Sequence, residues 1–395
     1  MPRTSRHRRT APVSSRTLLI FLLILLVAAS IYLATGNDPL GIFAAPTPTA
    51  TSLPTATLPA PFTIGRQNWW HVFFTDPLAL NDPAVLAGTI EEKLIAWIDV
   101  AQTSIHIASF EFDLTPVADA LIAARRRGVD VRWITDDEHG LESDFEEGHG
   151  QFAMLQNASI EIRDDSRSAL MHHKFWIFDR RVVWTGSTNI TINGIFKQDN
   201  NVIVIESPEL AAIYERQWED MWNGNFNARS PSGVEEQSVN VNGSQVQVLF
   251  SPEDGAMSYV ISYVQEAQDS IRFMAFAFTD YPLADAMRTR ASAGVDVSGV
   301  FERVGSDTEY AELRTLWCSG VPVRQDGNSS FMHHKLIIID DRIVITGSLN
   351  FSTSADEDNN ENVIIIENPE IATLYLHEFE RVWSLARDPL DLICP

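Results

Sequence analysis

An internal duplication constrains the fold of this chain more than any other feature. The segment AQTSIHIASFEFDLTPVADALIAARRRGVDVRWI from Ala101 parallels AQDSIRFMAFAFTDYPLADAMRTRASAGVDVSGV from Ala267. Further along, NVIVIESPELAAIYERQWEDMW from Asn201 parallels NVIIIENPEIATLYLHEFERVW from Asn362. A repeat of this length indicates two related domains rather than a solenoid of short units. The 395 residues are enough for two domains of ordinary size.

Each half shows the same alternation of helix and strand. Short β-rich runs such as SIHIASFEF and VDVRWI alternate with amphipathic segments such as PVADALIAARRRG, in which Gly128 is typical of a helix end. Each half therefore predicts helix, strand, helix and strand, then a motif region, then a final strand and helix. We expect an α/β layer architecture made twice, over 66–230 and 245–395, with 231–244 as the connection.

A polar pattern heads an apolar run in each half. MHHKFWIFDRRVVWTGSTN starts at Met171 and MHHKLIIIDDRIVITGSLN starts at Met332, so His, Lys, Asp, Gly, Ser and Asn recur at the same spacing. Because side chains alternate along a strand, His172 and Lys174 point the same way and His173 points to the opposite face. A buried structural histidine would explain either copy alone, but not two copies at matched spacing.

The rest of each motif predicts a β-hairpin. A turn at 179–181 brings the returning strand back, so that Ser187 and Asn189 lie beside the histidine and the lysine. Asp179 has the wrong parity for that strand face and is expected to shape the turn. The same geometry in the second half gathers His333, Lys335, Ser348 and Asn350, with Asp340 at the turn.

This set of side chains has a chemical logic. A neutral imidazole can attack phosphorus or move a proton near neutral pH, and lysine and asparagine donate hydrogen bonds to phosphate oxygens. Covalent cleavage of a phosphodiester needs two such groups, a nucleophile and an acid for the leaving alcohol, and the duplication supplies both. Metal binding is disfavoured, because His172 and His173 face apart and the neighbouring lysine repels a cation.

Both stretches match the His-x-Lys-x4-Asp-x6-Gly-Ser-x-Asn signature of the phospholipase D superfamily, and the chain from about Trp70 onward resembles its two-copy members, bacterial phospholipase D-like and cardiolipin hydrolase-like proteins. The resemblance implies two duplicated α/β/α lobes with mixed sheets packed about a pseudo-two-fold axis, and metal-independent hydrolysis through a phosphohistidine, without a cofactor. It implies that His172 is the nucleophile and His333 the general acid. The remaining motif residues are Lys174, Lys335, Asp179 and Asp340 as catalytic candidates, and Ser187, Asn189, Ser348, Asn350 and Glu361 as substrate-binding candidates.

One position departs from the family pattern. Many members carry a glutamate shortly after Gly-Ser-x-Asn, and the second half has it as Glu361, whereas the first half has Asn200. A carboxylate stabilises an imidazolium, so the two histidines are expected to differ in basicity. The order of nucleophile and acid stays open on these residues. FEF from Phe110 and FAF from Phe276 end matching strands, where they line either the cleft or the core.

The N-terminal segment lies outside the duplicated region and has a different composition. Residues 17–37 carry no charge and follow a basic tail over 1–16, which predicts a transmembrane helix with the tail in the cytoplasm and the rest exported. A cleaved signal peptide, giving a secreted protein, is the alternative. The stretch 38–65 is rich in proline and threonine and is typical of an extended linker. Cys318 and Cys394 are the two cysteines, and their pairing in a disulfide stays open.

The net charge of -24 bears on the substrate. Proteins that grip nucleic acid without sequence preference usually show a basic face, so the charge disfavours DNA, although an acidic surface can also serve solubility alone. We therefore expect a monomer that hydrolyses phospholipids to phosphatidic acid and an alcohol, held at the membrane by its N-terminal segment. The alternatives are an exported endonuclease, a cardiolipin synthase-like phosphatidyltransferase, and a non-catalytic surface binding module.

Overall fold

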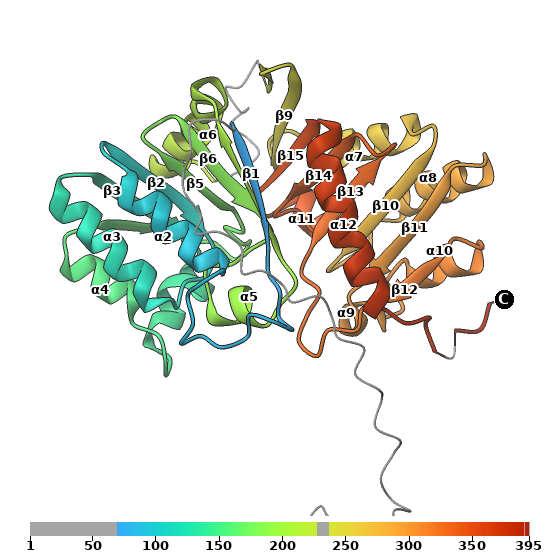
Figure 1. The fold of residues 1–395 in the computed structure, drawn as a ribbon, viewed down its shortest axis with the longest axis horizontal. Helices are drawn as coiled ribbons and strands as arrows, with labels where there is room; N and C mark the ends of the chain where they lie inside the picture. Colours follow the sequence, from blue (N-terminus) through green and yellow to red (C-terminus); the bar gives the residue numbers. More distant parts are fainter. Residues whose placement is uncertain (1–68, 227–236, 391, 395) are drawn as a thin grey trace, which may run out of the picture. The chain divides into compact units, whose positions relative to one another are not determined.

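The computed structural model describes residues 69–226, 237–390 and 392–394. These residues form two lobes, each built on one mixed sheet, which lie beside each other in Figure 1. The duplicated α/β lobes implied by the sequence are thus present. The expected basic tail, the transmembrane segment and the linker lie outside the described residues.

The first lobe has a seven-stranded sheet in the order β1-β7-β6-β5-β2-β3-β4. Strands β2, β3 and β4 run parallel to one another, and the other pairs are antiparallel. The strands are β1 (Trp70–Phe74), β2 (Ser104–Ser109), β3 (Asp130–Thr135), β4 (Glu161–Asp164), β5 (Lys174–Phe178), β6 (Val182–Gly186) and β7 (Asn201–Glu206). The helices are α2 (Ile90–Val100), α3 (Thr115–Arg127), η1 (Asp137–Glu142), η2 (Ser143–Phe145), α4 (Gln151–Asn157), α5 (Ile192–Phe196) and α6 (Pro208–Trp222).

The second lobe repeats this topology in an eight-stranded sheet, β12-β11-β10-β13-β14-β15-β9-β8. Its additional edge strand, β8, lies within the stretch expected to connect the lobes. The strands are β8 (Ser238–Val241), β9 (Ser244–Ser251), β10 (Ser270–Ala275), β11 (Asp296–Phe301), β12 (Val323–Gln325), β13 (Lys335–Ile339), β14 (Ile343–Gly347) and β15 (Glu361–Glu367). The helices are α7 (Ala256–Glu266), α8 (Tyr281–Ser292), α9 (Arg303–Ser306), α10 (Leu313–Cys318), α11 (Thr353–Glu357) and α12 (Pro369–Leu385).

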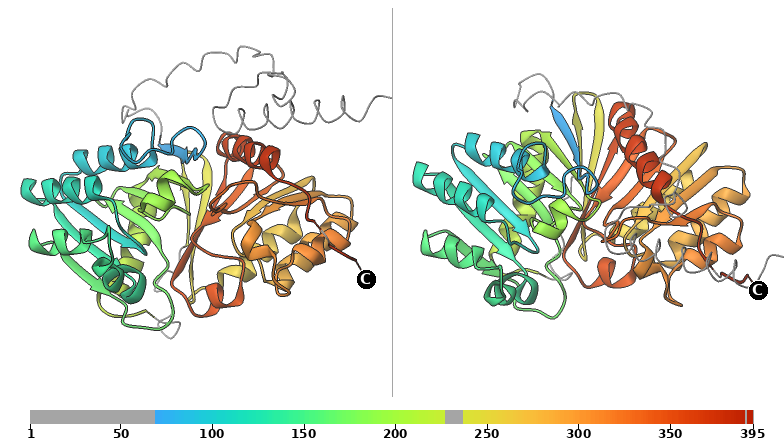
Figure 2. Two further views of the ribbon diagram at one scale, coloured as in Figure 1. Left: turned by 90° about the horizontal axis from the view of Figure 1, so that it is seen from below. Right: turned by 60° about the horizontal axis from the view of Figure 1, so that its bottom comes forward.

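Three apolar cores hold the layers together. On β5, Phe175 and Ile177 face a central core shared by both sheets, α6 and α12, while Trp176 and Phe178 face an outer core under α2 and α3. The second sheet has its own outer core under α7 and α8. Figure 2 shows these outer helices on the far sides of the two sheets. Because both faces of each sheet are buried, β5 and β13 are apolar at every position after the lysine.

The transmembrane helix in the predicted fold class requires a correction. None of the helices within 69–226, 237–390 and 392–394 combines the length and the apolar character needed to cross a bilayer. The helices of the structure are instead amphipathic or short elements that cover the sheets. The two lobes over these residues are therefore the fold class that the structure supports.

The hairpins that carry the motifs depend on local backbone geometry. Asp179 and Arg180 form the turn between β5 and β6, with φ of 51° and 52°, a left-handed conformation that Asp tolerates better than most residues. At the other end of β6, Gly186 has φ of 150°, and a Cβ built there would lie 2.3 Å from the backbone oxygen of Asn201. Glycine thus permits β6 to approach β7 closely, just before Ser187.

Candidate active site

The two motifs meet at the boundary between the lobes. The backbone N–H of His172 donates to the carbonyl of Asn360 in the other lobe at 3.0 Å, and that of His333 donates to the carbonyl of Asp199 at 2.9 Å. The start of each motif is therefore fixed by the partner lobe. Both histidines are only 6% exposed, and the lysine of each lobe acts electrostatically on the histidine of the other.

The histidine of the first lobe is held by a carboxylate from the second. His172 Nδ1 lies 2.8 Å from both carboxylate oxygens of Glu361. Burial lowers the pKa of His172 well below its usual value, and Lys174 lowers it further; burial also raises the pKa of Glu361 to about 8. Lys174 and Lys335 oppose the effect of burial on Glu361 and favour its ionised form. The proton shared by the pair then lies on Nδ1 of His172, Glu361 accepts it, and Nε2 keeps a free lone pair.

The histidine of the second lobe is held by neutral groups from the first. His333 Nδ1 lies 2.9 Å from Oδ1 of Asn200 and 3.1 Å from the backbone oxygen of Ser187. Burial and then Lys335 hold the pKa of His333 well below its usual value. Both rings thus direct Nδ1 at an acceptor, but only His172 has a carboxylate there.

The motif serines orient these partners. Ser187 Oγ donates to Oδ1 of Asn200 at 2.8 Å, and Ser348 forms a hydrogen bond with Glu361. The serines were expected to touch substrate. In the structure their hydroxyl groups contact the side chains that hold the two histidines, and their contact with substrate stays a prediction.

The two lysines lie in equivalent, buried positions. Lys174 Nζ donates to the carbonyl of His172 and Lys335 Nζ to that of His333, each at 2.9 Å. Lys174 Nζ also lies 5.0 Å from the ring centre of Phe110, and Lys335 Nζ lies 4.6 Å from that of Phe276. Burial lowers the pKa of Lys174 to about 8, and burial together with Lys174 lowers that of Lys335 well below its usual value. An anion bound beside both would restore their charge.

The motif asparagines differ between the lobes. Asn189 Nδ2 donates to Oε2 of Glu111 at 2.8 Å. The corresponding position in the second lobe is Ala277, so Asn350 lacks such a partner within the described residues. The Oδ1 atoms of both asparagines are buried without a hydrogen bond from the described chain.

The motif aspartates lie away from this cluster. Asp179 is in the hairpin turn, where its carboxylate accepts hydrogen bonds from the backbone N–H groups of 102–104. Asp340 does the same for 268–270 in the second lobe. Strand β5 lies between His172 and Asp179. At about 3.3 Å per residue, its five residues span roughly 16 Å. These residues act on the fold of each hairpin.

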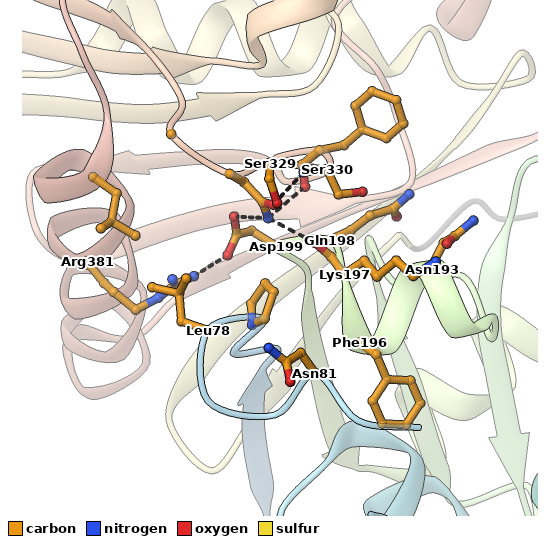
Figure 3. A pocket seen from close by; sticks show the side chains of 15 residues that line it. Leu78, Asn81, Asn193, Phe196, Lys197, Gln198, Asp199, Ser329, Ser330 and Arg381 are labelled. Carbon is orange, nitrogen blue, oxygen red and sulfur yellow. Dashed lines mark hydrogen bonds and ion pairs between the residues drawn. The ribbon is translucent and has the colours of Figure 1, made fainter. Parts of the chain in front are cut away.

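A separate cavity of about 610 Å³ lies near the end of α12 and is drawn in Figure 3. Arg381 there pairs with Asp199 at 2.6 Å, and Asn328 Nδ2 donates to the same carboxylate at 2.7 Å. The cavity does not include either motif histidine or lysine among its lining residues. Its Asp199 fixes the backbone of His333, so the cavity adjoins the support of the site rather than the reacting groups.

The family of the chain follows from its sequence matches. A family described as "Cardiolipin synthase, PLD-like domain" matches residues 94–222 and 260–383, one segment in each lobe and more than half of the chain. The protein belongs to this family. Both matched segments contain a complete motif.

Individual relatives agree with this family. Human mitochondrial cardiolipin hydrolase is 37% identical over 136 residues, which is 33% of this chain and 52% of that protein. Phospholipase D of Rickettsia conorii is 34% identical over 136 residues, 34% of this chain and 68% of that protein. The match therefore spans about half the length of the human relative. The solved phosphatidylserine synthase of Haemophilus influenzae Rd KW20 shares the fold over 80% of this chain and 85% of that one, with a TM-score of 0.59 and 15% identity.

Two residues of the site were not identified as functional from the sequence. Asn200 was recognised only as a departure from the family glutamate, yet it holds His333. Glu111 is the middle residue of FEF, which the sequence indicates only as a strand end lining either the cleft or the core. In the structure Glu111 contacts Asn189. The contrast between FEF and FAF in the aligned halves was the available signal for Glu111.

Proposed function

We propose that the protein is a phospholipase D-like phosphodiesterase that hydrolyses phospholipids to phosphatidic acid and an alcohol. The observation that carries the proposal is the convergence of two complete motifs, with His172 and His333 each held at Nδ1 by the opposite lobe. Two rings with Nε2 free can share nucleophilic and acid roles across one phosphorus atom. No cofactor enters the proposed reaction.

In the first step, Nε2 of His172 attacks phosphorus and the bond from phosphorus to the leaving oxygen breaks. His333, protonated on Nε2, transfers its proton to that oxygen, so the alcohol leaves neutral. Glu361 stabilises the positive charge that develops on the ring of His172. The ring of His333 faces only neutral acceptors, which makes its imidazolium a stronger acid. These differences support His172 as the nucleophile.

In the second step, water attacks the phosphorus atom of the phosphohistidine. His333 Nε2 now accepts a proton from that water, and the bond between phosphorus and His172 Nε2 breaks. Lys174 and Lys335 hold the phosphate oxygens throughout, with the N–H groups of Asn189 and Asn350. Phosphate binding also favours protonation of His333, because its anionic oxygens offset the two lysine charges that lower the pKa of the ring.

A lipid substrate is favoured by the names of the relatives and by the charge of the chain. The relatives are named cardiolipin hydrolase and phospholipase D. The net charge of -24 opposes avid binding of a polyanion such as DNA. Each phosphodiester of a phospholipid carries a single negative charge, which two lysines are enough to neutralise.

The test offers the full chain, with chelator present, vesicles of phosphatidylcholine, phosphatidylglycerol or cardiolipin, and single- and double-stranded DNA. We expect phosphatidic acid to be released from at least one phospholipid, and His172→Ala and His333→Ala to abolish that release. Cleavage of DNA without turnover of lipid, lost in the same variants, would contradict the proposed substrate.

We also propose that the two lobes work outside the cytoplasm. Cys318 and Cys394 form a disulfide, and disulfides persist mainly in oxidising compartments. Protein isolated from its native cells under alkylating conditions should carry no alkylated cysteine until it is reduced. Alkylation of both cysteines without reduction would contradict this location.

A further inference from the structure

The two halves of the site differ at one charged position near the reacting groups. The bridges Phe112 to Ile190 and Phe278 to Phe351 are equivalent in the two lobes. The residue before each phenylalanine is Glu111 in the first lobe and Ala277 in the second. The duplication therefore places a carboxylate at this position in the first lobe and a methyl group at the equivalent position in the second.

Glu111 lies within electrostatic reach of the two motif lysines and is hydrogen-bonded to a motif asparagine. Its Oε2 accepts from Asn189 Nδ2 at 2.8 Å, and its charge raises the pKa values of both Lys174 and Lys335 against the stronger effect of burial. Its side chain is partly exposed, and among the described residues no donor contacts its Oε1. One oxygen of the carboxylate is thus committed to the site, and the other is available to a ligand.

A carboxylate beside a bound phosphodiester weakens binding unless another contact compensates, because the two anions repel each other. The hydrogen bond to Asn189 does not by itself explain the presence of Glu111, because Asn350 occupies the equivalent position without a carboxylate. A carboxylate is an acceptor only, and a charge-assisted hydrogen bond from a ligand is stronger than a neutral one. A donor on the substrate would both satisfy Oε1 and offset the repulsion.

We infer that Glu111 is a specificity-determining residue that accepts a hydrogen bond from an N–H or O–H donor next to the phosphodiester of the substrate. The donor is a hydroxyl group, as in a glycerol headgroup, or an ammonium group, as in an ethanolamine headgroup. This inference rests on the proposed function and names the substrates that the site prefers. Phospholipids whose alcohol carries no donor are the poorer substrates.

The experiment compares matched lipids on the full chain. Phosphatidylglycerol is paired with phosphatidylpropanol, which lacks the hydroxyl donors. Phosphatidylethanolamine is paired with phosphatidylethanol, which lacks the ammonium donor and its positive charge. We expect kcat/KM to favour at least one donor lipid, and Glu111→Gln to reduce that preference by about tenfold or more, the range of a hydrogen bond to a charged group. The pair that responds identifies the hydroxyl or the ammonium source.

Glu111→Gln is informative because glutamine keeps an oxygen that accepts from Asn189. Glu147→Gln removes the same charge from an exposed residue that, within the described part of the chain, has no hydrogen bond or ion pair with a motif residue, and it should leave both preferences unchanged. An equal loss on donor and donor-free lipids would overturn the inference and reduce Glu111 to a support for Asn189.

A binding measurement keeps this inference separate from the proposed function. Calorimetry compares glycerol phosphate with propyl phosphate, and ethanolamine phosphate with ethyl phosphate, on the wild-type chain and on Glu111→Gln. Absence of lipid turnover would contradict the proposed function, while a donor preference in binding that Glu111→Gln removes would still support the inference. Equal affinities within both pairs for the wild-type chain would overturn it.

Discussion

The histidines of the two lobes occupy equivalent positions but have different partners. His172 lies against the carboxylate of Glu361, and His333 lies against the amide oxygen of Asn200. Each partner comes from the opposite lobe and is oriented by a motif serine. Duplication thus supplies a symmetric frame, and we expect the single difference between Glu and Asn to give the two rings different basicity.

The largest expected effect comes from removing either histidine. His172→Ala and His333→Ala should each lower kcat for a phospholipid by about a thousandfold or more, because each removes a group that takes part directly in bond formation or proton transfer. Because the two residues act as a unit, either loss alone should be nearly as large as the loss of both. A p-nitrophenyl phosphodiester separates the roles, because its leaving group needs no acid. His333→Ala should still release one burst of p-nitrophenol per enzyme, and His172→Ala should not. The reverse pattern would exchange the two roles.

The carboxylate that distinguishes the two rings can be neutralised. Glu361→Gln should lower kcat by about 10- to 100-fold, the range of a charge-assisted hydrogen bond, because the ring of His172 then lacks a stabilising charge. Asn200→Asp is the reciprocal variant. It should raise the pKa of His333 and move the pH profile of kcat upward. Equal and small effects of both substitutions would show that the two partners are interchangeable.

Because the lysines are buried, we expect the activity to fall at high pH. Lys174, whose pKa is lowered to about 8 by burial, is charged below that pH and loses its charge above it. The value of kcat/KM reports the free enzyme, so it should fall as the pH rises above about 8. Lys174→Arg keeps the charge at that position, so the fall of kcat/KM above pH 8 should become shallower, with the remaining fall due to Lys335, whose pKa burial also lowers. A wild-type profile that stays flat to pH 10 would contradict this role for lysine.

The smallest effect on catalysis is expected at the hairpin turns. Asp179→Ala removes an acceptor of three backbone N–H groups and should lower the free energy of unfolding by about 1–3 kcal/mol, with kcat nearly unchanged. Hydrogen bonds lower the pKa of this carboxyl despite the opposing effect of burial. The stability it contributes is therefore present above the unfolded pKa of about 3.9 and lost as the pH falls through the lower folded pKa.

Chemical denaturation at pH 7 and pH 3 measures this contribution, and Asp340→Ala is the matched variant in the second lobe. A large loss of kcat with unchanged stability would instead place Asp179 in the chemistry.

Much of the fold was predictable because the duplication doubles each signal. The hairpin at Asp179 and the amphipathic segment ending at Gly128 follow from local patterns, and both are present. Strands β1 and β4 were missed, because five or fewer residues at or near a sheet edge carry little periodicity. Strand β8 was missed because it lies in a stretch that resembles a connection.

The candidate site was likewise predictable from the sequence only in part. The grouping of His172 with Lys174 follows from strand parity and hairpin geometry within one lobe. The pairing of His172 with Glu361 depends on how the two lobes face each other, which no local pattern encodes. The role of Glu111 was hidden for a similar reason, since a glutamate at a strand end usually faces solvent.

The central claim is that His172 forms the covalent bond to phosphorus, and trapping the intermediate tests it most directly. The full chain is mixed with a short-chain phospholipid, quenched within one turnover, digested and mapped by mass spectrometry under conditions that preserve phosphohistidine. The account predicts a phosphatidyl adduct on the peptide that contains His172, and its absence in His172→Ala. An adduct on His333 would reverse the assignment, and an absence of any adduct in a chain that turns over substrate would contradict covalent catalysis.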